Sequence, residues 1–336
     1  MARSKRRSKK IEPAVKTLTF ALGDGGVSYI DLSLAASIAN RRFYRQGLNW
    51  AVSGISLFSS GLTQTISILK LPDTWVAYNA WVKSFNLWRE MNEQVLDVEP
   101  HIQGRYSDFK IFMDTDHRDN VLEMVLQTDV NSAAKTLTPI VINNAGDNPQ
   151  WPSINNLNWD PSEYVFPDPV AGTADSYHAH MVGENSTTAQ GTVAGSKGLI
   201  LGYAYSRARP NVIDPNVPVD APTKAWMNDV FDYGDQNPEI REDLIEENDS
   251  PPYPIAGDES NAEYYPGGFN NLNGLEVVIP AVTVTGTTDY SARMSFPGFN
   301  VPCGLMRVKN TGPCMIQVHL TPGPHRGYLA VPMQEF

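Results

Sequence analysis

The stretch NWAVSGISLFSSGLTQTISILKL, residues 49–71, alternates apolar and polar side chains with a period of two. Its apolar residues, beginning with Trp50, fall on one face of a strand as far as Gly54. From Ile55 onward they continue one residue out of phase, which predicts a β-bulge near Gly54. After a turn at 60–61 the alternation resumes, so this stretch predicts a strand, a turn and a returning strand.

The same pattern of short alternating segments separated by turn residues continues along the chain. It predicts further strands at 15–22, 27–34, 108–113, 121–130, 137–143, 176–182, 199–206, 275–285, 301–309 and 315–320. The sequence GDGG at residues 23–26 predicts a hairpin between the first two of these strands. Together the segments predict an all-β fold in which two antiparallel sheets form a sandwich.

One segment has helical periodicity. Asn79 is placed to cap it, and large apolar residues recur at three- and four-residue spacing before Val95. We expect an inserted amphipathic helix that covers a sheet, lies at a seam between subunits, or only fills the core. Long segments at 144–173 and 210–274 are rich in Pro, Asn, Asp and Gly, and are expected to be surface loops with a function.

The first ten residues, MARSKRRSKK, contain no acid and six bases: Arg3, Lys5, Arg6, Arg7, Lys9 and Lys10. Residues 1–12 are therefore expected to be a disordered basic arm ahead of one folded domain at 13–336. Because the arm contributes +6 to a total charge of −11, residues 11–336 carry −17. This asymmetry predicts that the arm binds a polyanion such as nucleic acid, or that it is a nuclear address on an ordinary acidic protein.

Acidity is concentrated at residues 229–263, which contain twelve carboxylates and one base, Arg241. Two interpretations stay open: a hydrated outer surface that limits nonspecific association, or a calcium site built from loop oxygens. The spacing of an EF-hand is absent.

The chain has two cysteines, Cys303 and Cys314, which are too few for a disulfide framework and are expected to be small core residues. No apolar run approaches the roughly 18 residues that a membrane-spanning helix needs. The N-terminus also lacks the apolar segment of a signal peptide. We therefore expect no membrane contact.

Residues 172–191 fit the first signature of the cupins, which are metal enzymes. His178 and His180 alternate along a predicted strand, so both rings can point to one face and share a metal with Glu184. The second cupin signature is missing, although His319 is a distant candidate for a fourth ligand. The alternative is a pair of ordinary strand or interface histidines without metal.

Two segments mix arginines with aromatic residues: NRRFYRQ at 40–46, with Arg41, Arg42 and Arg45, and YAYSRAR at 203–209. Such segments bind phosphates and stack on bases, or pair with the acidic surface of a neighbouring copy. The sequence contains no nucleophile elbow, phosphate-binding loop or dinucleotide motif. We therefore expect no enzymatic activity, catalytic residue or cofactor.

Several blocks, taken in order, resemble the capsid proteins of small circular Rep-encoding single-stranded DNA viruses of the circo-like group. They are KLPDTW at 70–75, NAW at 79–81, DFKI at 108–111, NDSPPY at 248–253, YPGG at 265–268, FNVPCGL at 299–305 and VHLTPGPHRGY at 318–328.

The resemblance implies a single jelly-roll subunit that self-assembles into an icosahedral T = 1 shell of about 60 copies. It also implies that the basic arm packages the single-stranded DNA genome and serves as a nuclear-import signal, which would place the protein in the virion and the host nucleus. The arm is shorter and less arginine-rich than in many relatives, which leaves part of the neutralisation to Arg41, Arg42, Arg45 or counter-ions. The alternatives are a cupin-like metal-dependent enzyme and a soluble sandwich that binds carbohydrate or protein.

Overall fold

A computed structural model describes most of the folded chain. The described residues are 13–22, 25–59, 63–98, 108–119, 135–137, 139, 161–167, 174–189, 193–207, 274–285 and 292–335. They are 51% strand and 25% helix, so the fold is mostly β, as predicted, but with more helix than one segment supplies. The arm at 1–12, the predicted strand at 121–130 and the acidic segment at 229–263 lie outside these residues.

The first sheet joins strands from both ends of the chain. Its order is β1 (Thr17–Leu22), β12 (Cys314–Leu320), β3 (Leu48–Ser59) and β10 (Ala292–Val301), with β15 (Ala330–Pro332) also paired to β3. All of these pairs are antiparallel. The register between β12 and β3 shifts where His319 faces Gly54 and Leu320 faces Val52, so Ser53 is an extra residue. The predicted bulge next to Gly54 is thereby confirmed.

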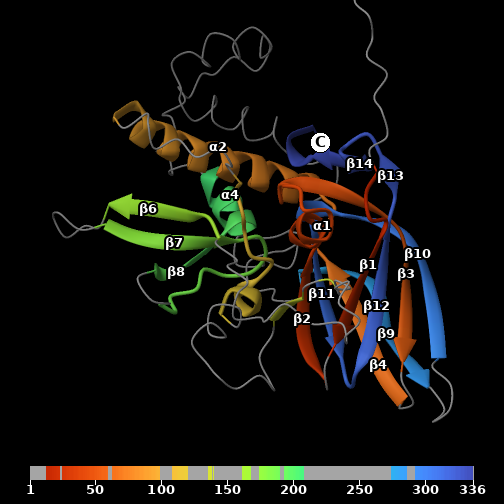
Figure 1. The fold of residues 1–336 in the computed structure, drawn as a ribbon. Helices are drawn as coiled ribbons and strands as arrows, with labels where there is room; N and C mark the ends of the chain where they lie inside the picture. Colours follow the sequence, from red (N-terminus) through yellow and green to blue (C-terminus); the bar gives the residue numbers. More distant parts are fainter. Residues whose placement is uncertain are drawn as a thin grey trace, which may run out of the picture.

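The second sheet lies opposite the first (Figure 1). Its order is β5 (Lys135–Leu137), β2 (Gly26–Asp31), β11 (Leu305–Asn310), β4 (Thr63–Lys70) and β9 (Glu276–Thr285). The β5–β2 pair is parallel and the other pairs are antiparallel. The two curled, mostly antiparallel sheets are compatible with the predicted sandwich.

A continuous apolar core fills the space between the two sheets. Residues from alternating positions of strands in both sheets are completely buried, including Phe20, Trp50, Leu57, Ile68 and Ile316. Each such side chain contributes about 1.5–3 kcal/mol by leaving water. Because this interior is packed with side chains, the sandwich is a scaffold whose outer surfaces and ends present the polar groups.

The described residues between β4 and β9 form what we call the inserted region. It contains α2 (Trp75–Val98), a small sheet of β6 (Glu163–Pro167), β7 (Ala174–His180) and β8 (Val193–Gly198), and α4 (Leu199–Arg207). Figure 1 shows these elements beside the sandwich, with α2 running across its upper end. A second apolar core joins them to the second sheet: Val76 and Trp81 of α2 and Ala179 of β7 pack with Tyr29 and Leu305.

The predicted hairpin at residues 15–34 is wrong. β1 pairs with β12 and β2 pairs with β11, so the GDGG turn carries the chain from one sheet to the other. The returning strand after residue 61 likewise lies in the opposite sheet from β3. Turn residues predict where a strand ends, whereas pairing in a sandwich is set by side chains far away in sequence.

Three strand predictions also need correction. The segment at 27–34 is a strand only to Asp31, whose side chain then accepts hydrogen bonds from the N–H groups of Ser33 and Leu34 and starts α1 (Leu32–Asn40). Residues 199–206 lie in α4. Residues 108–113 contribute only a single bridge, between Phe112 and His180.

The long helix is confirmed, but Asn79 does not cap it, because α2 begins four residues earlier, at Trp75, and Asn79 lies inside the helix. The predictions at 275–285 and 315–320 correspond to β9 and β12. Cys303 and Cys314 are buried and free, as expected of small core residues, although Cys303 lies in the 3₁₀ turn η4 (Pro302–Gly304).

Candidate nucleic-acid interface

The arginine segment at 40–46 follows the end of α1. Arg41 adopts a left-handed conformation, with φ 54° and ψ 40°, and the N–H groups of Arg41 and Arg42 both donate to the carbonyl of Ser37. This cap turns the chain away from the helix axis. Arg41, Arg42 and Arg45 are exposed, whereas Tyr44 is buried.

Gln46 anchors this segment to the inserted region. Its side-chain amide donates to Asp31 at 3.2 Å and to the carbonyl of Ile111 at 3.1 Å, while its carbonyl accepts from the Ile111 N–H at 2.7 Å. The Gln46 N–H donates to Asp108 at 3.1 Å. These bonds hold Arg45 near the Asp108 carboxylate. Burial raises the pKa of Asp108 to about 6, although the Gln46 N–H, Lys110 and Arg45 oppose this shift.

A second basic loop meets the first from the C-terminal end of the chain. Strands β13 (Pro322–Gly323) and β14 (Gly327–Tyr328) form a tight hairpin with His325 and Arg326 in its turn. The Arg326 guanidinium donates to the carbonyl of Phe43, and the Tyr44 hydroxyl donates to the carbonyl of Arg326 at 3.0 Å. The two loops are therefore bonded to each other.

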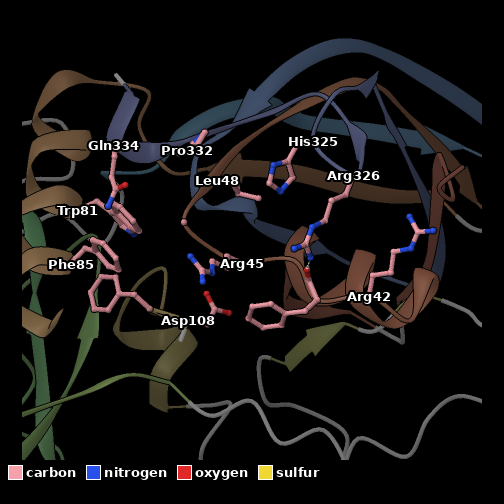
Figure 2. A pocket seen from close by; sticks show the side chains of 13 residues that line it. Arg42, Arg45, Leu48, Trp81, Phe85, Asp108, His325, Arg326, Pro332 and Gln334 are labelled. Atoms are coloured by element: carbon pink, nitrogen blue, oxygen red, sulfur yellow. Dashed lines mark hydrogen bonds between the residues drawn. The ribbon is translucent and has the colours of Figure 1, made fainter. Parts of the chain in front are cut away.

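A pocket of about 730 Å³ opens between these loops and α2. Figure 2 shows Trp81 and Phe85 on one side, Arg42 and Arg326 on the other, and Arg45 with Asp108 between them. The Trp81 and Phe85 rings are stacked, with centroids 5.1 Å apart and planes at 9°, and Phe109 packs edge-on against Trp81. One wall of the pocket is thus aromatic and the other is cationic.

Trp81 has two features that concern the pocket. Gly47 lies against its ring, because a Cβ at that position would be 2.3 Å from the ring edge, so the approach requires glycine. The buried indole N–H of Trp81 has no hydrogen-bond partner within the described residues. A buried donor without a partner is uncommon, and its burial closes this N–H to the pocket.

The described chain begins beside this basic surface. The Val15 N–H donates to the side chain of Asn40 at 2.9 Å, and the Tyr328 hydroxyl donates to the Val15 carbonyl at 2.6 Å. Asn40 directly precedes Arg41, and Tyr328 lies two residues after Arg326. The arm bases, Arg3 to Lys10, lie outside the described residues, but they join the folded chain at this end.

The histidine motif has a different environment from the one predicted. His178 and His180 are buried on β7, but Glu184 is exposed beyond the strand. The fully buried Arg118 approaches Nδ1 of His178 to 3.5 Å, and a guanidinium there opposes a metal cation. His319 lies in the first sheet, bonded to Thr17 and Ser56. Within the described ranges, no group of three or more His, Cys, Asp or Glu is arranged to hold a metal.

A buried network joins the inserted region to the sandwich near these histidines. Arg307 of β11 forms ion pairs with Asp114 at 2.9 Å and Asp116 at 3.0 Å. Asp114 is completely buried and also accepts from the Tyr29 hydroxyl at 2.7 Å. His117 stacks on Tyr29, with centroids 4.0 Å apart. None of these contacts was predicted, because Arg307 and Asp114 are almost two hundred residues apart.

The buried histidines predict a loss of stability in acid. Burial lowers the pKa of His117 to about 3 and those of His178 and His180 to about 4. Since an unfolded histidine has a pKa of about 6.5, the unfolded chain binds more protons below that pH. Stability from these groups is therefore fully present above pH ~6.5 and is lost as pH falls toward 4.

His180→Leu tests this pH dependence. Neither ring nitrogen of His180 has a hydrogen-bond partner of good geometry within the described residues, although the backbone of Gly183 and Glu184 favours the protonated ring electrostatically. Between pH 6 and 4.5 the variant should lose about 1 kcal/mol less per pH unit than the wild type in urea unfolding. Asp108, whose pKa is raised in the folded state, adds stability as pH falls in both proteins. The readout is therefore the difference between the stability curves of the variant and the wild type. Parallel curves would contradict the prediction.

Two further predictions, on the second arginine segment and on membrane-spanning helices, can be compared only with the described part of the chain. Residues 208–209 of the second arginine segment are outside the described residues, and Tyr203 packs edge-on against Trp75 of α2, with centroids 6.4 Å apart. No helix in the described part of the chain combines the length and apolar character needed to span a membrane.

Comparison with known proteins leaves the chain without an assigned relative: no family model, curated protein or solved structure matches it.

Proposed function

We propose that this protein is a viral coat subunit with a jelly-roll fold, which self-assembles into an icosahedral shell and packages single-stranded DNA. The observation that carries the proposal is the strand order. Numbered from 1 to 8 along the chain, β1, β2, β3, β4, β9, β10, β11 and β12 are ordered 1-8-3-6 in one sheet and 2-7-4-5 in the other. This order results when one long hairpin, with pairs 1–8, 2–7, 3–6 and 4–5, curls over on itself, and it is the jelly-roll order of many capsid domains.

The jelly roll also occurs in cupins and lectins, so the site must discriminate between these functions. A cupin-like enzyme would need His178, His180 and Glu184 to share a metal. His178 and His180 lie in the inserted region with Arg118 beside them, and Glu184 faces solvent. A structural role without catalytic residues is therefore favoured over the enzyme.

The distribution of charge supports a nucleic-acid partner. Arg41, Arg42, Arg45 and Arg326 gather at the end of the sandwich from which the six-base arm extends. Cations at one end of an otherwise acidic protein provide affinity for phosphates without sequence preference, and leave the remaining surface to other contacts. In a closed shell this end would face inward, toward the genome. The same arm would serve as the nuclear-import signal that brings the subunit to its site of assembly.

Negative-stain electron microscopy with light scattering on the purified full chain tests assembly. We expect uniform spherical particles tens of nanometres across, because weak contacts repeated by closed symmetry add up to a stable shell. A monomer or dimer that persists across salt, pH and added single-stranded DNA would contradict the proposal.

A further inference from the structure

We propose that the pocket between the basic loops and α2 binds one nucleotide of a single strand, with its phosphate on the arginines and its base against the aromatic wall. The inference rests on the proposed packaging function and deepens it. It replaces a purely diffuse charge attraction by one defined contact in each subunit.

The cationic wall is built to hold a phosphate. Arg326 is fixed by its bond to the Phe43 carbonyl, and the backbone that carries Arg45 is held by the bonds of its neighbour Gln46. The Arg45 guanidinium has no hydrogen bond within the described residues, although it lies near Asp108. Guanidinium groups bind phosphate oxygens in a two-pronged geometry, and a preorganised fork loses little entropy when it does so.

The aromatic wall is built to hold a base. Trp81 and Phe85 are already stacked on each other, and Arg89 lies over the Phe85 ring, so a base that enters the pocket packs against an ordered aromatic cluster (Figure 2). Asp108 is the complementary acceptor for an exocyclic amino group. An anion alone would need none of these groups.

The other candidate occupant is the acidic segment 229–263 of a second copy. Its carboxylates would also pair with Arg42, Arg45 and Arg326, but they would leave the aromatic wall without a function. Val15, near the start of the described chain, is bonded to Asn40 and Tyr328, which lie two residues from the pocket residues Arg42 and Arg326. A strand bound by the arm therefore passes the mouth of the pocket, which favours the nucleotide.

Mononucleotide titration of the full chain tests the pocket apart from the arm, because one nucleotide carries too little charge to depend on the arm. The probes are the four deoxynucleoside monophosphates, with deoxyadenosine and inorganic phosphate as partial ligands, followed by calorimetry. We expect at least one nucleotide to bind with a Kd of about 0.1–1 mM, and each partial ligand to bind at least about tenfold more weakly.

Two variants address the two walls, each with a matched control on α2. Arg45→Gln and Phe85→Ala should each weaken nucleotide binding about tenfold or more. Lys83→Gln removes an exposed cation that lies over Tyr203, and Leu87→Ala removes an exposed apolar side chain; neither residue lines the pocket, and both variants should bind like the wild type. Thermal unfolding of all four variants identifies any loss of binding that results from misfolding.

Three outcomes would overturn the inference: no nucleotide binding, binding unchanged in both wall variants, or inorganic phosphate binding as tightly as the nucleotides. Competition by a synthetic peptide of residues 229–263 that is itself weakened by Arg45→Gln would assign the pocket to a second copy. Shells that contain DNA but bind no mononucleotide would refute only this inference. Nucleotide binding by a chain that never assembles would refute only the coat function.

Discussion

Removal of residues 1–10 is expected to give shells of normal size that contain almost no nucleic acid. The deletion removes six bases and no described contact of the folded chain, since the described residues begin at 13. For single strands each neutralised phosphate contributes about 0.7 to the slope of log affinity against log salt, so the slope should fall by about 4. Purified particles should therefore show the ratio of 260 to 280 nm absorbance of protein alone.

The controls separate charge from sequence and from length. A scrambled arm with the same ten residues should package DNA normally, because phosphate attraction does not depend on residue order. A Gly/Ser arm of equal length should behave like the deletion. Equal absorbance ratios for the deletion and the full chain would show that packaging does not need the arm, and would leave the arginines of the folded chain as the packaging surface.

Arg307→Met is expected to destabilise the protein by about 3–5 kcal/mol, because it leaves the buried Asp114 carboxylate without its cation. Asp114 is completely buried and the Arg307 side chain is only 17% exposed, so water cannot replace the lost partner. Urea unfolding of unassembled protein at pH 7 measures the change. The Arg307→Met substitution should also loosen the inserted region from the sandwich, since the ion pair between Arg307 and Asp114 joins the two.

Arg89→Met is the matched control. Its ion pair with Glu93 on α2 is exposed, at 55% and 63%, and such pairs contribute about 0–1 kcal/mol. In the double variant Arg307→Met/Asp114→Asn the buried charge is gone, and we expect part of the stability to return. A change below about 1 kcal/mol for Arg307→Met, or no recovery in the double variant, would show that the junction does not depend on this pair.

The local features of the fold were predictable from the sequence, whereas the pairing of strands within each sheet was not. The bulge next to Gly54 and the helix α2 were correctly predicted because each depends on periodicity within a few turns or residues. The partner of β1 is β12, about three hundred residues away, and no pattern in residues 15–34 specifies it. The helices that begin at Leu32 and Leu199 were missed because short apolar runs fit a strand as well as a helix.

Only one side of the candidate site, the arginine segment at 40–46, was predicted from the sequence. Arg41, Arg42 and Arg45 were identified because bases stand beside aromatic residues in one segment. The opposite wall comes from α2, whose Trp81 and Phe85 have the spacing of ordinary core residues, and Arg326 comes from a hairpin near the C-terminus. The signal for Arg326 was the PGPHRG turn at 322–327, which projects two basic side chains from a tight hairpin.

The pairing of β1 with β12 has a consequence for synthesis on the ribosome. Thr17 and His319 are 302 residues apart, so the first sheet stays open until nearly the whole chain has emerged. Such long-range closure is slow and comes late in folding. The contact of Tyr328 with Val15 forms last of all, and with it the paired basic loops. Under the proposed packaging function, a nascent chain would lack the finished surface for nucleic acid, and premature capture of cellular RNA would be limited to its short arm.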